Sequence, residues 1–593
     1  MTLDFKMWYT LSLLIIMSIL LILDIIELEV LFFSILLLLL MGKIITLEEA
    51  FAGFSNVGML TIALLFVIAG ALSNTGMLKQ ISPIILGKEN TRISHTLLKL
   101  LFPVSIISAF INNTPVVAMF IPTIRSWTEK HHYAPSKYLI PLSYGAILGG
   151  MCTLIGTSTN LIIHGLMIDY GMEGLGFFEI SKIGIPVAIL GILFTSFLGH
   201  RLLPNRKEPL IELGEHTREF VIELKVTQEY ENIGKTIESA GLRKLKGLFL
   251  FQIERNGRRI APAKPDEKIL LDDRLFFTGV PKTILELQKI PGLQLTKDSH
   301  FNLKQYDSAE IRTFECVVSP GSPLVGKTVR DSDFRSKYEA VIIAIHRHGE
   351  RIAKKIGDIS LRPGDTLLLL AGKNFYKKWY HSKDFYLIAV TEALPSKPQW
   401  RGYVSVGVFF MMIILTVANI LPLLSAAGLG VIILVLTRTA NAGEVRRTID
   451  WRVLIIIAMS LGIANAVKQS GLADVLAHII VRIGDHFGLL GILASIYFFT
   501  SIYTLVITNN AAAAMLFPIA VSAASAINAD QRGFAIAIVI AASASFATPI
   551  SYQTNLMVYG PGGYRFRDYL MIGAPLQLGI GAIAIALIYC FYF

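Results

Sequence analysis

Charged side chains are scarce in this chain. Asp, Glu, Lys and Arg together make up 16% of its 593 residues, whereas hydrophobic side chains make up 53%. A composition so poor in charge excludes an ordinary soluble globular protein. Apolar runs long enough to cross a bilayer recur toward both ends of the sequence, so we expect a polytopic α-helical membrane protein surrounded by lipid.

Cysteine is rarer still. The chain contains only three cysteines, which is too few for a disulfide framework. We find no nucleophile–base pair and no cluster of metal-binding residues, so we expect the protein not to be an enzyme. The net charge of +11 comes without any nucleic-acid-binding motif. In a membrane protein such an excess is typical of Lys and Arg in cytoplasmic loops. We therefore expect no nucleic-acid partner.

Charge is distributed unevenly, and this divides the sequence into three blocks. Residues 1–204 and 399–593 are apolar, whereas residues 205–398 contain most of the charged side chains, and their apolar residues come in short runs typical of strands. Basic residues flank the polar block, at Arg201 and Lys397 among others. Positive flanks favour the cytoplasmic side. We therefore predict two transmembrane blocks in the inner cell membrane, with the polar block inserted between them as a cytoplasmic unit.

The polar block is a tandem repeat. The segment NIGKTI (residues 232–237) returns as LVGKTV (residues 324–329), and a strand–turn–strand pattern follows in both copies. Three pairs of residues keep one spacing of 92 residues: Thr236 and Thr328, Gly257 and Gly349, Asp273 and Asp365. We therefore predict two related domains, at residues 205–304 and 305–398.

Both copies resemble the C-terminal domain of potassium-conductance regulators, known as RCK-C or TrkA-C. The shared pattern is GKT near the start, two strands joined by a turn that contains glycine, and a Pro-Gly-Asp turn at residues 363–365, although the first copy has Asp272 where the second has Gly364. The resemblance implies small α/β units that dimerise, so we expect a homodimer. Some members of that family bind nucleotides such as cyclic di-AMP, which implies a regulatory nucleotide at these domains.

The two apolar blocks also repeat one another. Their six apolar segments are predicted near residues 10–23, 29–42, 57–73, 98–124, 138–157 and 183–203, and near residues 403–421, 423–438, 452–467, 489–520, 533–549 and 571–592. If the fourth segment of each block is a re-entrant hairpin, five segments per block cross the membrane. Since five is odd, the blocks take opposite orientations, as in the inverted repeats of secondary transporters. The loops predicted outside, such as 164–182 and 468–488, carry no excess of Lys and Arg, which agrees with this orientation.

The fourth segments carry polar residues at the depth of the bilayer. INNTPVVAMFIP (residues 111–122) matches ITNNAAAAMLFP (residues 507–518). About 45 residues later, GTSTNL (residues 156–161) matches SYQTNL (residues 551–556). Backbone that is broken inside a membrane survives only where protein covers it or where it lines a wet cavity. We therefore expect these four stretches to meet inside the protein.

The breaks offer two kinds of chemistry at one place. We expect Thr114 at the N-cap of a helix with Pro115 in its first turn, which leaves Asn112 and Asn113 in the link between two arms. Amide and hydroxyl oxygens are neutral ligands suited to a monovalent cation, and the N-terminus of the second arm suits an anion. A single Asn pair usually acts as hydrogen-bonding glue between helices. Two such pairs, each followed by a matched Thr-Asn, favour a binding site.

Here the sequence resembles the divalent-anion:sodium symporters, a family of dicarboxylate, citrate and sulfate carriers. Their signature is a Ser-Asn-Thr triplet at each of two hairpin tips, backed by a Gly-Thr-x-x-Asn break, and residues 112–114 and 509–511 stand at the triplet positions. The resemblance implies two overlapping sets of site residues. The substrate set is Asn113, Thr114, Asn510, Ala511, Ser551 and Tyr552, and the sodium set is Asn112, Asn113, Gly156, Asn160, Asn509, Asn510, Ser551 and Asn555.

Departures from that signature narrow the range of candidate substrates. Ala511 lacks the hydroxyl that family members use, and Tyr552 stands where dicarboxylate carriers usually have a small Thr, so a smaller anion is favoured. Members with an RCK-C insert at this position resemble the sulfate carriers. Acidic residues are nearly absent from the apolar segments, which favours sodium over protons as the coupling ion.

We therefore predict sodium-coupled transport of a small divalent oxyanion, with sulfate as the first candidate. A sodium-coupled dicarboxylate or citrate symporter is the alternative within the same class. A potassium channel or uptake subunit regulated by RCK domains is the alternative of another class, but it requires a selectivity filter of the TVGYG kind, which the sequence lacks.

Overall fold

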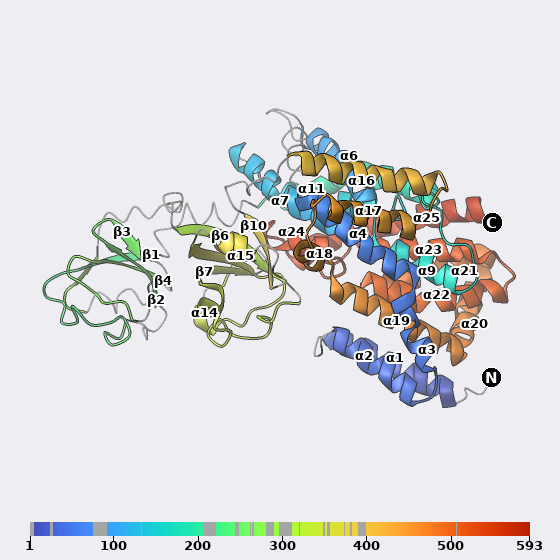
Figure 1. Cartoon of the computed structure of the whole chain (residues 1–593), viewed down its shortest axis with the longest axis horizontal. Coiled ribbons are helices and arrows are strands. Elements are labelled where there is room, and N and C mark those ends of the chain that lie inside the picture. The colour runs from blue at the N-terminus through green and yellow to red at the C-terminus, as the bar shows by residue number, and fades with distance from the viewer. Residues whose placement is uncertain are drawn as a thin grey trace.

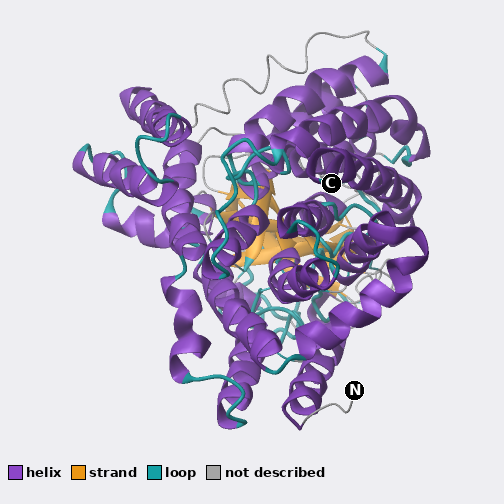
Figure 2. Cartoon of the chain, turned by 90° about the vertical axis from the view of Figure 1, so that its right-hand side faces the viewer, coloured by secondary structure: helices purple, strands orange, loops and turns teal. Residues whose placement is uncertain are grey.

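The computed structural model consists of a body of helices with two β-sheets set in line on one side of it (Figure 1). The second sheet lies between the helices and the first sheet, and a view from the helical end places the strands behind the helices (Figure 2). The structure describes residues 5–23, 26, 28–74, 92–131, 133–206, 221–242, 248–260, 263, 266–279, 290–295, 311–319, 321–347, 350–352, 356–372, 374–379, 382, 384–389, 399–505 and 507–593.

The apolar runs of the first block form helices, because long stretches of Leu, Ile and Met satisfy their own backbone hydrogen bonds only in that form. They are α1 (Phe5–Leu23), α2 (Leu28–Met41), α4 (Val57–Asn74), α6 (Ile93–Phe110), α7 (Asn113–Lys130), α8 (Leu139–Gly150), α9 (Ser158–Asp169) and α10 (Ser181–Phe194). The fourth predicted segment is thus divided into two helices. The fifth corresponds to α8 and the break after it, and α9 lies beyond its predicted end at residue 157.

The second block repeats this order. Its helices are α16 (Gln399–Val417), α17 (Leu423–Leu436), α19 (Trp451–Gln469), α21 (Gly488–Tyr503), α22 (Asn509–Ala526), α23 (Gln531–Ser543), α24 (Gln553–Tyr559) and α25 (Phe566–Tyr592). Again the fourth segment is divided into two helices, and α24 lies beyond the predicted end of the fifth segment at residue 549. The break before α22 and the break before α24 correspond to those before α7 and α9.

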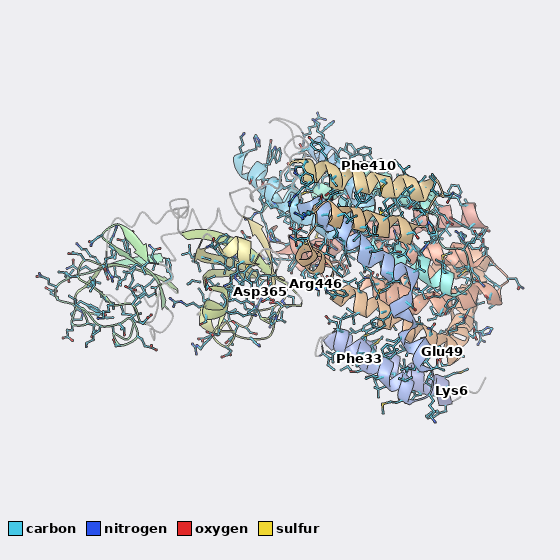
Figure 3. The ribbon with its side chains drawn as sticks, viewed as in Figure 1. Lys6, Phe33, Glu49, Asp365, Phe410 and Arg446 are labelled. Atoms are coloured by element: carbon cyan, nitrogen blue, oxygen red, sulfur yellow. The ribbon has the colours of Figure 1, made fainter. Side chains whose placement is uncertain are left out.

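Five of the described helices are long and apolar enough to cross a membrane, or six if a bent pair of helices counts as one span. Large apolar side chains such as Phe33 on α2 and Phe410 on α16 lie exposed on the outside of the helical body, where lipid would cover them (Figure 3). The prediction of a polytopic helical membrane protein is therefore confirmed.

One predicted loop is wrong. Residues 468–488 were predicted to be a loop between two apolar segments, but residues Leu472–Gly484 within them form helix α20, which bends by 77° from the helix before it. Its buried residues, including Leu472 and Ala477, recur along one face and its charged residues occupy the other. This amphipathic pattern, which a search for continuous apolar runs overlooks, stabilises a helix against α21 and α22.

Each half of the polar block forms a five-stranded antiparallel sheet. The first consists of β1 (Val221–Val226), β2 (Leu248–Arg255), β3 (Arg258–Ile260), β4 (Arg274–Gly279) and β5 (Leu293–Leu295), and the second of β6 (Ile311–Val318), β7 (Ala340–Arg347), β8 (Glu350–Arg351), β9 (Thr366–Gly372) and β10 (Phe385–Ala389). We call these units the first and second sheet domains. The strand order is β3-β2-β4-β1-β5 in one and β8-β7-β9-β6-β10 in the other, which is the same order.

The two sheets also share their irregularities. A bulge lies between Leu250 and Gln252 in the first sheet and between Ile342 and Ala344 in the second. Asp272 adopts a φ of +64°, and Gly364 at the equivalent position has +82°. The turn before the fourth strand therefore requires left-handed backbone in both copies, which costs the aspartate more than the glycine. Each sheet domain has a separate hydrophobic core.

Candidate functional site

The first tip is the link between α6 and α7, at Ile111 and Asn112. Both helices pack on α8, so the link lies inside the helical body. Helix α7 begins at Asn113, which is completely buried and accepts a hydrogen bond of 2.7 Å from the hydroxyl of Ser108. The expectation that Thr114 is the N-cap is therefore wrong, because Thr114 lies within the first turn of α7.

The second tip is the link between α21 and α22. Helix α22 begins at Asn509, and its N-cap is Thr508, whose hydroxyl accepts a bond from the backbone N–H of Ala511. The amide oxygen of Asn509 lies 3.4 Å from the hydroxyl of Ser545. Since α7 and α22 begin at Asn113 and Asn509, these two asparagines are structurally equivalent. The triplet positions 112–114 and 509–511 had instead paired Asn112 with Asn509.

Each tip faces a break in the next segment, and the two breaks have the same internal bonds. Between α8 and α9, the amide nitrogen of Asn160 donates to the carbonyl oxygens of Gly150, at 3.2 Å, and Thr153, at 2.7 Å. Between α23 and α24, Asn555 donates in the same way to Ser545 and Thr548, at 3.1 Å each. The two asparagines thus satisfy carbonyl groups that the broken helices leave without partners.

The two breaks differ in what the asparagine oxygens contact. The Oδ1 atom of Asn555 accepts a bond of 2.7 Å from Ser143. The Oδ1 atom of Asn160 is buried and has no hydrogen-bond partner. An orphaned amide oxygen in a buried site costs free energy unless a ligand satisfies it. Neutral oxygens of this kind suit a monovalent cation, so the first break fits the sodium ion that the sequence implies.

The tips and the breaks contact one another across the two blocks. The amide nitrogen of Asn113 donates to the Tyr552 hydroxyl at 2.7 Å, and that hydroxyl lies 3.1 Å from Oγ1 of Thr157. Beside it, the Thr114 hydroxyl donates to Oε1 of Gln553 at 3.2 Å. The first tip is therefore bound to the break of the second block.

The second tip is bound to the break of the first block, but here the side chain of the tip accepts the hydrogen bonds. Oδ1 of Asn510 accepts bonds from Ser158 at 3.0 Å and from Thr159 at 3.2 Å. Asn510 on α22 thus stands in the place that Thr114 has on α7. The four stretches singled out by the sequence lie together, and a pseudo-symmetric network of uncharged donors and acceptors joins them.

Three predicted residues have other surroundings. Asn112 lines a cavity of about 30 Å³ beside Ser158 of the network, among apolar side chains that come mainly from α4. The side chain of Ala511 is fully buried and offers no polar atom. The Ser551 hydroxyl donates to the carbonyl oxygen of Thr548 at 3.0 Å, which gives it a role in holding the break.

Gly156, which belongs to the sodium set, lies where a larger side chain does not fit. A Cβ at this position would lie 2.5 Å from the carbonyl oxygen of Gly150. Sequence reasoning missed Ser108, Ser143 and Ser545, which hold the asparagine side chains of the network. No sequence signal separates them from other serines in apolar runs.

Comparisons with known proteins find a family and relatives that match most of the chain. The family described as citrate transporter (CitMHS) matches residues 14–538. The chain is 37% identical over 563 residues to a putative sulfur deprivation response regulator of Chlamydomonas reinhardtii, a match that covers 93% of this chain and 96% of the relative.

Two further relatives are also matched along most of their length. Sodium/sulfate cotransporter 1 of the same alga is 27% identical over 752 residues, with 92% of this chain and 85% of the relative covered. An uncharacterized transporter of Synechocystis sp. is 28% identical over 584 residues, with 97% and 95% covered. This chain belongs to the citrate-transporter (CitMHS) family, whose members are membrane transport proteins and not enzymes.

Proposed function

We propose that the protein is a sodium-coupled symporter of a small divalent oxyanion, with sulfate as the substrate. The observation that carries this proposal is the network in which two tips and two breaks from opposite blocks meet in a buried, uncharged site. Relatives named sodium/sulfate cotransporters support both the ion and the anion. The apolar segments contain few acidic groups, and a proton-driven carrier usually depends on such groups.

The anion would bind between the tips. The first turns of α7 and α22 present backbone N–H groups and the positive ends of two helix dipoles. Asn113 and Thr114 add side-chain donors at the first tip, and the hydroxyls of Ser158 and Thr159, which donate to Asn510, add donors at the second. To receive a dianion, these side chains would exchange their bonds to the opposite block for bonds to the oxyanion.

Sodium would bind at the breaks, with Asn160 Oδ1 as a ligand at the first break. Its charge would reduce the repulsion that the dianion meets on leaving water, which explains why the two solutes travel together. The tips are proposed to be re-entrant hairpins, and the body that carries them would move against the remaining helices to expose the site to each side in turn.

The polar block is proposed to be a pair of cytoplasmic RCK-C domains, at residues 205–304 and 305–398, between transmembrane repeats at 1–204 and 399–593 of the inner membrane. Two sheets with one strand order and the same turn and bulge support the tandem repeat. Homodimerisation and binding of a regulatory nucleotide are the corresponding proposals for these domains.

A citrate or dicarboxylate symporter is the second candidate, because the matching family is described as citrate transporter. The bulk of Tyr552 inside the network favours the smaller anion. The potassium-channel alternative receives no support from the relatives, whose names describe transporters, cotransporters and a regulator of the sulfur response.

Uptake into proteoliposomes tests the proposal. We expect accumulation of labelled sulfate when sodium is outside, and little uptake when potassium replaces it or when only a proton gradient is present. Unlabelled sulfate should compete better than citrate or succinate. Equal uptake with and without a sodium gradient would refute the coupling, and stronger competition by citrate would favour the second candidate.

A further inference from the structure

The second sheet domain contacts the transport helices through a buried ion pair. A guanidinium nitrogen of Arg125 on α7 lies 2.7 Å from a carboxylate oxygen of Glu315 on β6, and the two side chains are only 5% and 3% exposed. Removing two charges from water is costly unless the partners are held in a defined geometry. The pair therefore indicates a specific docking surface between α7 and the sheet.

The alternation of β6 explains how the strand reaches this surface. Phe314, Cys316 and Val318 point into the core of the second sheet domain. Successive side chains of a strand point to opposite faces, so Glu315 and Val317 point the other way. Val317 is completely buried in the core of the helical body, which makes this strand a shared wall of the two units.

A second contact joins the same domain to α24. The turn before β9 places Gly364 so close that a Cβ there would lie 3.1 Å from the side chain of Leu556. Just beyond α24, a Cβ at Gly560 would lie 2.0 Å from the hydroxyl oxygen of Thr366. Thr366 is buried, so the sheet fits against the end of α24 with no spare room.

The two helices that the second sheet domain contacts, α7 and α24, are also the helices that meet at the proposed transport site. α24 packs on α7, and their first residues are joined by the bonds from Asn113 to Tyr552 and from Thr114 to Gln553. Arg125 lies twelve residues after Asn113, or about 18 Å along the helix. The sheet therefore holds together the far ends of two helices whose near ends satisfy one another.

We propose that the second sheet domain is an autoinhibitory clamp on the transport site. While it is docked, α7 and α24 stay together, and the side chains that would bind the anion remain bound to each other. When it undocks, the helices separate and the site accepts an anion. This inference rests on the proposed function for its substrate, but the contact between the sheet and the two helices stands independently of it.

Gly560 provides a sharp test. In Gly560→Ala the new methyl group meets the Thr366 hydroxyl and displaces the sheet. In the double variant with Thr366→Ala that hydroxyl is gone, and the nearest remaining atoms are 3.3 and 3.4 Å away, so docking returns. Gly579→Ala on α25 is the matched control, because its Cβ would meet nothing within 4 Å.

Sodium-driven sulfate uptake by the full chain in proteoliposomes is the first measurement. The clamp reduces the fraction of binding-competent protein, so Gly560→Ala should lower the half-saturating sulfate concentration about fivefold. The double variant should return to the parent value, and Glu315→Gln should act like Gly560→Ala. A merely damaged protein would lose uptake and would not gain affinity.

Hydrogen exchange at residues 553–559 is the second measurement, and it needs no substrate. It should be faster in Gly560→Ala and Glu315→Gln than in the parent and the control. Unchanged or weaker sulfate affinity in both variants would overturn the clamp, as would unchanged exchange. Absence of sulfate uptake by the parent would instead refute the proposed function, and the exchange result would then decide the clamp.

Discussion

Asn160 and Asn555 occupy equivalent positions in the two blocks but differ in one atom's surroundings. Both use their amide nitrogen to bind two freed carbonyl groups. Only Asn555 has a donor, Ser143, on its amide oxygen. The oxygen of Asn160 remains available for a cation. The two breaks of the pseudo-symmetric site therefore differ by a single hydrogen bond. On the proposed function, this difference makes the first break the better candidate for the sodium site.

Replacing each asparagine tests this inequality. Asn160→Ala and Asn555→Ala lose the same backbone support, so each is the control for the other. Only the first loses a free oxygen ligand. We expect Asn160→Ala to raise the sodium concentration for half-maximal uptake about tenfold, in line with the strength of one bond to a charged partner. Equal shifts in the two variants would contradict the assignment.

The sequence predicted the principal residues of this site and missed their supports. Two Asn-Asn pairs with matched Thr-Asn pairs are visible because they repeat between blocks. Ser143 and Ser545 are ordinary serines in apolar runs, and only the packed neighbours give them a role. The start of α7 was also misplaced by two residues, because Asn, Thr and Pro in succession allow more than one capping arrangement.

Close packing of α6 on α8 fixes the position of the first tip. Gly149 on α8 faces the backbone of α6, and a Cβ there would lie 2.1 Å from the carbonyl oxygen of Ser105. The Ser105 hydroxyl donates to the carbonyl oxygen of Gly145 at 2.6 Å, one turn away on α8. Small residues let membrane helices approach in this way, so that side-chain hydroxyls reach the neighbouring backbone.

Gly149→Ala should therefore push α6 away from α8. We expect it to lower the free energy of unfolding by about 2 kcal/mol, the usual cost of overpacking a tight contact. The readout is the apparent melting temperature of the purified protein in detergent. Gly428→Ala on α17 is the control, because the nearest atom to its Cβ would be 3.8 Å away. A melting temperature equal to that of the control would show that α6 and α8 accommodate the added methyl group without a loss of stability.

A buried acid holds the turn before the fourth strand in both sheets. Asp365 accepts two bonds of 2.7 Å from Arg347 and one of 2.8 Å from the backbone N–H of Arg362. These side-chain bonds raise the pKa of the Arg347 guanidinium. Asp273 and Arg255 form the same pair in the first sheet. The spacing of 92 residues therefore reflects a repeated structural support.

Asp365→Asn should weaken the second sheet domain. The aspartate is 1% exposed, so its loss leaves the arginine without its charged partner and costs about 3 kcal/mol. Hydrogen exchange of the amides in β7 and β9 measures this change. Asp358→Asn is the control, since Asp358 pairs with Arg330 at a site where both side chains are more than half exposed. That pair should contribute less than about 1 kcal/mol.

Elements with strong periodicity were predictable, and amphipathic connections were not. Long runs of apolar residues predicted the transmembrane helices, and short apolar runs predicted the paired strands of the polar block. Helix α20 was taken for a loop because only part of its surface is apolar. The docking of β6 on α7 could not be foreseen either, since Glu315 and Val317 read as the outer face of a sheet strand until the helices that cover them are known.

On the proposed function, the two blocks take opposite orientations in the membrane. Helices α6 to α10 have counterparts in α21 to α25 in the same order, and the tips of the two sets bind each other's breaks. Such reciprocal contacts arise when two similar units are related by a two-fold axis in the membrane plane. On this proposal the polar block lies on one side of the membrane, and the loop after α9, which α10 separates from it, lies on the other.

Labelling of single cysteines tests this sidedness. The background variant carries Cys590→Ser, since Cys152 and Cys316 are buried and Cys590 is exposed. Exposed positions are then chosen on either side: Glu173, after α9, and Lys327, in the insert. A maleimide that cannot cross membranes should label Glu173→Cys in intact cells and Lys327→Cys only after permeabilisation. Labelling of both in intact cells would place the polar block and the loop on the same side, which a single crossing of the membrane by α10 does not allow.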